Sequence, residues 1–185
     1  AKQDNKSNSL CVMVHGDSAM SGQGVVAEVT NMAYLHDYTV GGSVHLVVNN
    51  QLGFTATERE TRSARYCTDI AKLIGAPVFH ANADRPEEVA AISEIAIDFR
   101  NKFKKDVFIN VIGYRRYGHN EMDEPSFTQP SMYSKIRATP SVVQLYKQSL
   151  EKRGVAVTVD AELSAFSKYL DEQFQKMQDY TPKVL

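Results

Sequence analysis

Two pairs of polar residues follow apolar runs that are typical of buried strands. Gly16-Asp17 comes after the run 10–14, and Asn49-Asn50 comes after the run 44–48. Asp17 offers a carboxylate and Asn50 an amide oxygen. Mg²⁺ prefers hard oxygen ligands of this kind, completed by phosphate oxygens. The sequence therefore predicts that Asp17 and Asn50 hold a magnesium ion against a phosphate group.

The residues beside Asp17 suit the phosphate half of such a site. Gly16 lets the backbone come close to a ligand. The backbone amides of Ser18 and Ala19, in the turn after the strand, are placed to donate to phosphate oxygens. Each polar pair taken alone is also typical of an ordinary turn. The two pairs together favour the magnesium interpretation.

Strand-like and helix-like segments alternate along the first two thirds of the chain. This alternation predicts an α/β fold, a parallel sheet with helices on both faces, whose ligands bind at the carboxyl ends of the strands. We expect an α/β domain over residues 10–130 and a helical extension over 131–185. The expected strands are 10–14, 44–48, 77–80 and 107–112; the expected helices are 25–35, 68–74, 86–104 (capped by Asp84), 131–153 and 161–178, with a long loop over 51–65.

Composition excludes several classes of protein. The chain has 185 residues, 43% of them hydrophobic and 23% charged, with 21 basic and 22 acidic side chains. Without a basic excess we expect no nucleic-acid partner, and no apolar run is long enough for a membrane span. Cys11 lies in an apolar run, so we expect it to be buried. The chain starts at Ala1, and we expect a piece of a longer polypeptide with any targeting signal upstream.

Three further features leave alternatives open. Gly22-Gln23-Gly24 resembles a dinucleotide fingerprint and would suit a nicotinamide-dependent oxidoreductase. The glycines come late after the strand, however, and the next strand ends in Asn rather than an acid. We therefore expect a tight turn with close helix packing. Arg59, Arg62 and Arg65 predict a solvated loop face, with a substrate carboxylate or a subunit contact as the alternative. His15 either touches a cofactor or packs.

The combined motifs resemble those of one family of enzymes that depend on thiamine diphosphate. The chain resembles the decarboxylase component of 2-oxoglutarate dehydrogenase and its 2-oxoadipate relative over residues 10–150. The residues that carry this resemblance are His15-Gly16-Asp17-Ser18-Ala19, Gly22-Gln23-Gly24, the segment 47–54 (Val-Val-Asn-Asn-Gln-Leu-Gly-Phe), Tyr114-Arg115, and the segment 118–125 (Gly-His-Asn-Glu-Met-Asp-Glu-Pro).

The resemblance implies a role for each of these motifs. Asp17, the Asn50 side chain and the Leu52 carbonyl would bind Mg²⁺. Gly16, Ser18 and Ala19 would lie beside the diphosphate. Many thiamine enzymes have glycine where this chain has Ser18. Tyr114, Arg115 and His119 would belong to a loop that closes over the cofactor, and His119 is the candidate catalytic residue.

The resemblance also implies an activity and partners. The reaction would be oxidative decarboxylation of a 2-oxo acid, with transfer of the acyl group to a lipoyl group on an acyltransferase component. We favour 2-oxoglutarate as substrate over 2-oxoadipate. A second domain, from the partner subunit of a homodimer, would supply the activating glutamate, so this piece alone would be inactive. The location would be the mitochondrial matrix or the bacterial cytoplasm. A truncated relative that only assembles with other subunits is the non-enzymatic alternative.

Overall fold

The chain divides at Val142 into two compact units. The computed structural model describes residues 9–155, 158–178 and 180–181. Across these ranges, no helix combines the length and the apolar composition needed to cross a membrane.

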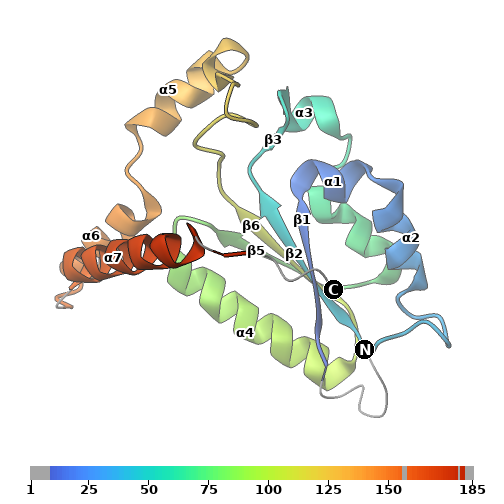
Figure 1. Ribbon diagram of the computed structural model, residues 1–185. Helices are drawn as coiled ribbons and strands as arrows, with labels where there is room; N and C mark the ends of the chain where they lie inside the picture. The colour runs from blue at the N-terminus through green and yellow to red at the C-terminus, as the bar shows by residue number, and fades with distance from the viewer. Residues whose placement is uncertain (1–8, 156–157, 179, 182–185) are drawn as a thin grey trace. The chain divides into compact units, whose positions relative to one another are not determined.

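The first unit is built on a sheet of four parallel strands in the order β1-β2-β6-β5 (Figure 1). The strands are β1 (Cys11–Gly16), β2 (Ser43–Asn49), β5 (Val78–Asn82) and β6 (Val107–Ile112). The register pairs Gly16 with Val48 and Asn49 with Ile112, so β1, β2 and β6 end at the same edge of the sheet. The predicted α/β fold is confirmed, and each strand ends within two residues of its expected bounds.

Helices cover both faces of the central strands β2 and β6. On one face lie α1 (Asp17–Gly22), α2 (Gly24–Met32) and the 3-10 helix η1 (Cys67–Ile74), and on the other lies α4 (Pro86–Phe103) (Figure 1). The first core consists of Met20, Val26, Val47, Cys67, Ala71 and Phe108, and the second of Val44, Ala96, Val107 and Ile109. Packing on both faces therefore fixes β2 and β6 in the middle of the sheet.

The sequence predicted that Asp84 caps the N-terminus of α4, and this prediction is wrong. Arg85 precedes α4, and no side chain caps this helix. Asp84, the expected cap, instead has a buried Oδ1 without a hydrogen-bond partner. Pro86 occupies the first helical turn, where its missing amide costs nothing.

The expected close helix packing at Gly22 and Gly24 is also wrong. A Cβ on either glycine would meet no atom within 4 Å, so these glycines do not serve close helix packing.

The expected loop over 51–65 contains a small hairpin and one helical turn. Strands β3 (Leu52–Gly53) and β4 (Ala56–Thr57) pair, and α3 (Glu58–Thr61) follows with a capping box between Thr57 and Glu60. After the short turn η2 (Pro125–Phe127), helix α5 (Pro130–Ala138) packs Tyr133 and Ile136 against Leu52. The first unit therefore extends past residue 130.

The second unit contains helices α6 (Val142–Lys152) and α7 (Val159–Gln178). Val142, the first residue of α6, is the last residue of the first unit. Lys147 Nζ lies 2.7 Å from Asp160 Oδ2 and links the two helices. The expected helix over 131–153 is two helices, α5 and α6, because Pro140 interrupts the hydrogen-bond ladder between them. The charged α7 buries none of its residues, as its composition predicted.

A glycine before β2 yields a stability prediction. Gly42 has φ +85°, and a Cβ there would lie 2.4 Å from the Lys105 carbonyl oxygen, an atom that cannot move aside by a rotamer change. We expect Gly42→Ala to lower the free energy of unfolding by ~1–2 kcal/mol for the left-handed backbone and a further ~1–3 kcal/mol for overpacking. Chemical denaturation measures this loss.

Gly75→Ala is the matched control. Gly75 also has a positive φ, +62°, but its Cβ would meet open space. It should show only the backbone cost. Equal losses for the two variants would contradict the proposed clash.

Candidate metal and diphosphate site

The two predicted ligand pairs meet at one edge of the sheet. Asp17 is the first residue of α1, directly after β1, and its side chain is only 3% exposed. Burial raises the pKa of Asp17. The backbone amides of Asp17 itself and of Asn50, together with the Arg62 guanidinium, oppose this rise. The backbone amide of Asn50, just after β2, therefore lies against the Asp17 carboxylate.

A tight turn fixes the residues after β2. The Asn49 side-chain oxygen accepts from the Gln51 amide at 2.9 Å, and that of Asn50 accepts from the Leu52 amide at 2.9 Å. Gln51 has φ +66°, and its Nε2 donates to the Gly113 carbonyl at 2.7 Å. An amide oxygen has two lone pairs, so Asn50 keeps one for a cation. The Leu52 side chain anchors the turn in the core of the first unit.

Ser18 lies where the first turn of α1 meets the hairpin. A Cβ on Gly53 would lie 2.3 Å from Ser18 Oγ and 3.1 Å from Thr61 Cγ2, so β3 passes close to α1 and α3 at this glycine. The Ser18 hydroxyl oxygen is buried and has no hydrogen-bond partner among the described residues. Ala19, whose carbonyl accepts from the Gln23 amide at 3.0 Å, follows it in α1. At Gly16, in contrast, a Cβ would meet no protein atom within 4 Å.

The donor set suits magnesium rather than a softer metal. Asp17 Oδ2 is buried and accepts no hydrogen bond, and a buried carboxylate oxygen left in this way is costly. The described residues contain no group of three or more His, Cys, Asp or Glu side chains placed to hold a metal. A single carboxylate with amide, backbone and phosphate oxygens matches the shell that Mg²⁺ uses. The residues present therefore fit this ion.

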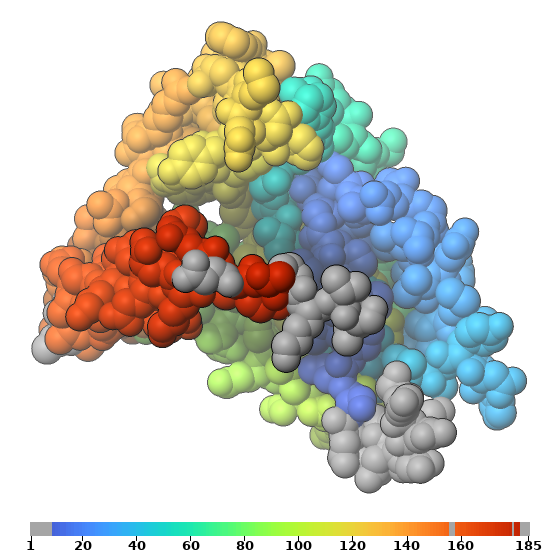
Figure 2. Space-filling view, in the orientation of Figure 1, coloured from blue at the N-terminus to red at the C-terminus, as the bar shows by residue number. Residues whose placement is uncertain are grey.

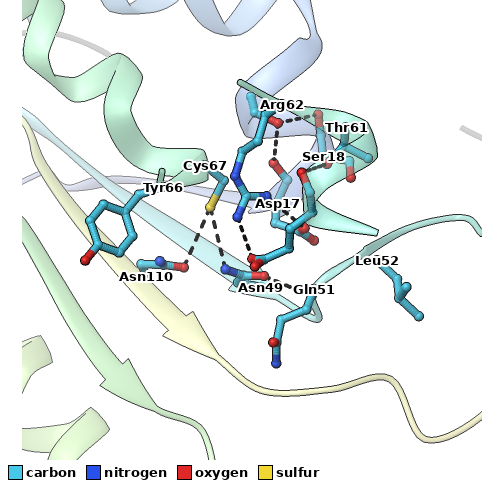
Figure 3. A network of polar contacts seen from close by, with 12 residues as sticks. Asp17, Ser18, Asn49, Gln51, Leu52, Thr61, Arg62, Tyr66, Cys67 and Asn110 are labelled. Atoms are coloured by element: carbon cyan, nitrogen blue, oxygen red, sulfur yellow. Dashed lines mark hydrogen bonds and ion pairs between the residues drawn. The ribbon is translucent and has the colours of Figure 1, made fainter. Parts of the chain in front are cut away.

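The sequence predicted that Arg62 lies on a solvated loop face, and for this residue the prediction is wrong. Arg59 and Arg65 are exposed, but the Arg62 side chain is only 6% exposed and points toward Asp17 (Figure 3). Its Nη2 lies 2.5 Å from Glu58 Oε1, and its Nη1 lies 3.9 Å from Asp17 Oδ2. The prediction failed because α3 turns the chain back over α1. The i,i+4 spacing of Glu58 and Arg62 was the only signal in the sequence.

A buried amide–thiol network beneath the site was also missed. Asn49 Nδ2 donates to Cys67 Sγ at 3.7 Å, and Cys67 Sγ donates to Asn110 Oδ1 at 3.8 Å (Figure 3). Asn110 Nδ2 lies 3.1 Å from His80 Nδ1. The network ties β2, η1, β6 and β5 together under the Asn49-Asn50 turn. The other cysteine, Cys11, is exposed, so its expected burial is wrong: no described helix covers it at the start of the edge strand β1.

His15 packs within the sheet layer. Its Nε2 lies 3.3 Å from His45 Nδ1, and His45 Nε2 lies 2.9 Å from Asp106 Oδ2. Burial and the neighbouring His45 both lower the pKa of His15. Of the two alternatives for His15, these contacts favour packing.

The loop over 114–129 lies against the hairpin. Figure 2 shows it, in yellow, beside the segment around residue 55, in teal; there Arg115 donates to the Phe54 carbonyl at 2.9 Å. The exposed ring of His119 has its centroid 5.0 Å from that of Phe54, and the His119 amide donates to Asp123 at 2.9 Å. Tyr114 accepts from Arg116 at 3.0 Å. Among the hydrogen bonds and ion pairs shown for the described residues, none joins this loop to Asp17.

Comparisons with known proteins agree on one family. Residues 1–184 match the model of the family "Dehydrogenase E1 component". A probable 2-oxoadipate dehydrogenase complex component E1 homolog of Dictyostelium discoideum is 47% identical over 178 residues, which are 94% of this chain and 20% of that protein. The mitochondrial 2-oxoglutarate dehydrogenase of Caenorhabditis elegans is 43% identical over 175 residues, 94% of this chain and 17% of its own length.

A bacterial relative is equally similar. A multifunctional 2-oxoglutarate metabolism enzyme of Mycobacterium sp. (strain JLS) is 49% identical over 170 residues, which are 91% of this chain and 13% of that enzyme. The chain thus spans a fifth or less of the length of these relatives.

The buried thiol gives a prediction that tests the network. Burial raises the pKa of Cys67 to about 11. Since the thiolate is the reactive form, we expect Cys67 to react with iodoacetamide at pH 8 at least ~100-fold more slowly than a free cysteine. Mass spectrometry of time points measures the rate, with the exposed Cys11 as the internal control. Comparable rates at both cysteines would contradict the packing around η1.

Proposed function

The chain belongs to the dehydrogenase E1 component family, and on that premise we propose that it holds Mg²⁺ and thiamine diphosphate in a 2-oxo acid decarboxylase. The single observation that carries this proposal is the Asp17 carboxylate, buried at the end of β1 with Oδ2 unpartnered and with Asn50 beside it. An unpaired carboxylate oxygen at this depth is retained where a ligand compensates its charge.

Each residue of the site has a proposed part. Asp17, the Asn50 side-chain oxygen and the Leu52 carbonyl bind Mg²⁺. Gly16, Ser18 and Ala19 lie along the diphosphate, where the unpartnered Ser18 hydroxyl can donate. Tyr114, Arg115 and His119 belong to the loop that closes over the cofactor. His119 acts there as the catalytic candidate, and its exposure leaves its ring free to turn from Phe54 toward a ligand.

The proposed reaction is oxidative decarboxylation of a 2-oxo acid. Thiamine diphosphate, when bound, supplies an electron sink for the loss of carbon dioxide. The chain's own contribution is to orient the cofactor by its diphosphate end and to exclude water there through the hairpin and the 114–129 loop. We propose 2-oxoglutarate as the substrate, with 2-oxoadipate as the alternative, because the relatives' names include both.

Partners and location follow from the same family. We propose that a lipoyl-bearing acyltransferase component receives the acyl group. A second domain, from the partner subunit of a homodimer, supplies the glutamate that activates the cofactor. The C. elegans relative is named as mitochondrial and another relative is bacterial. The mitochondrial matrix or the bacterial cytoplasm is the proposed location.

Substitution of the central carboxylate tests the proposal. In the full-length protein, Asp17→Ala should weaken magnesium-dependent binding of thiamine diphosphate by at least ~100-fold, equivalent to ~2.7 kcal/mol. Isothermal titration with and without Mg²⁺ measures the affinity. The control is Asp37→Asn, which removes an exposed carboxylate. Unchanged affinity in Asp17→Ala would remove the central assignment, and NAD binding by the wild type would favour the nicotinamide-dependent alternative.

The chain by itself should not turn over substrate. It spans a fifth or less of its relatives, and the proposed activating glutamate belongs to another domain. We therefore expect no release of carbon dioxide from 2-oxoglutarate by the pure 185-residue chain with Mg²⁺ and thiamine diphosphate present. A radiometric assay checks this, with the full-length protein as positive control. Turnover by the chain alone would show that the site is complete within it.

A further inference from the structure

The atoms that lack partners gather around Arg62. Five buried side-chain atoms of the described residues have no hydrogen-bond partner, and four of them are Asp17 Oδ2, Ser18 Oγ, and Nε and Nη1 of Arg62. Each buried donor or acceptor left unpaired destabilises the folded state. A cluster that combines unpaired donors with an unpaired carboxylate oxygen points to a ligand that pairs with both.

The contact between Arg62 and Asp17 is not a closed salt bridge. The Nη1–Oδ2 distance of 3.9 Å allows electrostatic attraction, but it is too long for a hydrogen bond. A guanidinium facing a buried carboxylate normally closes to a short, often bidentate pair. Here the two groups attract each other, while Asp17 Oδ2 and Arg62 Nη1 each lack a hydrogen-bond partner.

The surroundings keep the guanidinium in this open arrangement. Arg62 Nη2 donates to Oε1 of Glu58, the first residue of α3, at 2.5 Å, and this ion pair holds one side of the guanidinium in place. The close approach of Gly53 to Ser18 and Thr61 brings α1, β3 and α3 together at this point. Nε and Nη1 therefore remain without hydrogen-bond partners, and the guanidinium points toward Asp17 (Figure 3).

We propose that Arg62 is an exchangeable counter-charge that couples cation binding to diphosphate binding. Without ligand it balances the buried charge of Asp17. When a divalent cation takes Asp17 Oδ2, the free Nε and Nη1 donors of Arg62 pass to a diphosphate oxygen. This inference rests on the proposed function, because it assumes that the metal–diphosphate pair binds at Asp17.

The coupling follows from the charges. A divalent cation alone must enter beside a positive guanidinium, so Arg62 weakens its binding to Asp17. A diphosphate removes that repulsion by pairing with the guanidinium, and an Arg fork suits phosphate oxygens well. By linkage, each ligand then raises the affinity of the other by the same factor, typically about 5–150-fold for coupled sites.

Two affinities of the full-length protein test the exchange. Mn²⁺ binding is measured alone by electron paramagnetic resonance, and thiamine diphosphate binding is measured at saturating Mg²⁺ by calorimetry. For Arg62→Gln we expect opposite changes: Mn²⁺ alone binds about tenfold more tightly, and thiamine diphosphate binds at least about tenfold more weakly. An arginine with only a structural role would weaken both, so that result would overturn the proposal, as would no change in either affinity.

Control variants separate charge, geometry and folding. Arg59→Gln removes the same charge from exposed α3 and should change neither affinity; a response equal to that of Arg62→Gln would overturn the proposal. If Arg62→Gln does not fold, as judged by circular dichroism, Arg62→Lys decides. Lys keeps the positive charge but lacks the guanidinium donors. We therefore expect unchanged Mn²⁺ affinity and weaker thiamine diphosphate binding. Unchanged thiamine diphosphate affinity would overturn the proposal. If the wild type itself shows no magnesium-dependent binding, the proposed function fails instead.

Discussion

A buried carboxylate at the end of β1 is the constraint on which the rest of the site depends. Asp17 is almost fully enclosed, and one of its oxygens has no hydrogen-bond partner. Burial works against its charged form, while two backbone amides and one guanidinium work for it. The surrounding elements therefore have to stabilise a charged group that is cut off from water.

The parallel sheet supplies the second half of the arrangement. Because β1 and β2 run in the same direction in a fixed register, the residue after Gly16 meets the residues after Asn49. Most of β2 is buried between the two helical layers, which fixes its place in the sheet. Two side-chain caps and a left-handed Gln51 then fold the chain sharply after Asn50. Regular structure thus sets the distance between the ligand pairs, and local turn chemistry sets their orientation.

The hairpin and the loop over 114–129 add a layer above this edge. They contact each other through the backbone carbonyl groups of Phe54 and Thr55, with Arg115 and Gln129 as the donors. Arg115 and Arg116 donate hydrogen bonds to carbonyl and hydroxyl oxygens. Glu124 forms its ion pair with Arg137 rather than with either of these arginines. The loop is therefore tied to the hairpin by side-chain-to-backbone bonds, which leaves His119 at its surface.

Sequence alone determined the α/β class and the four strands, and it placed Asp17 and Asn50 at the ends of neighbouring strands, because apolar periodicity and strand-end residues are local signals. It also carried the family resemblance, since the motifs are short and contiguous. Only the tertiary structure decided the environment of Arg62, Cys11 and Cys67. Their burial depends on which distant element covers them: α3 folds Arg62 inward, η1 places Cys67 between β2 and β6, and the edge position of β1 leaves Cys11 exposed. Such long-range packing leaves no periodic trace in the chain.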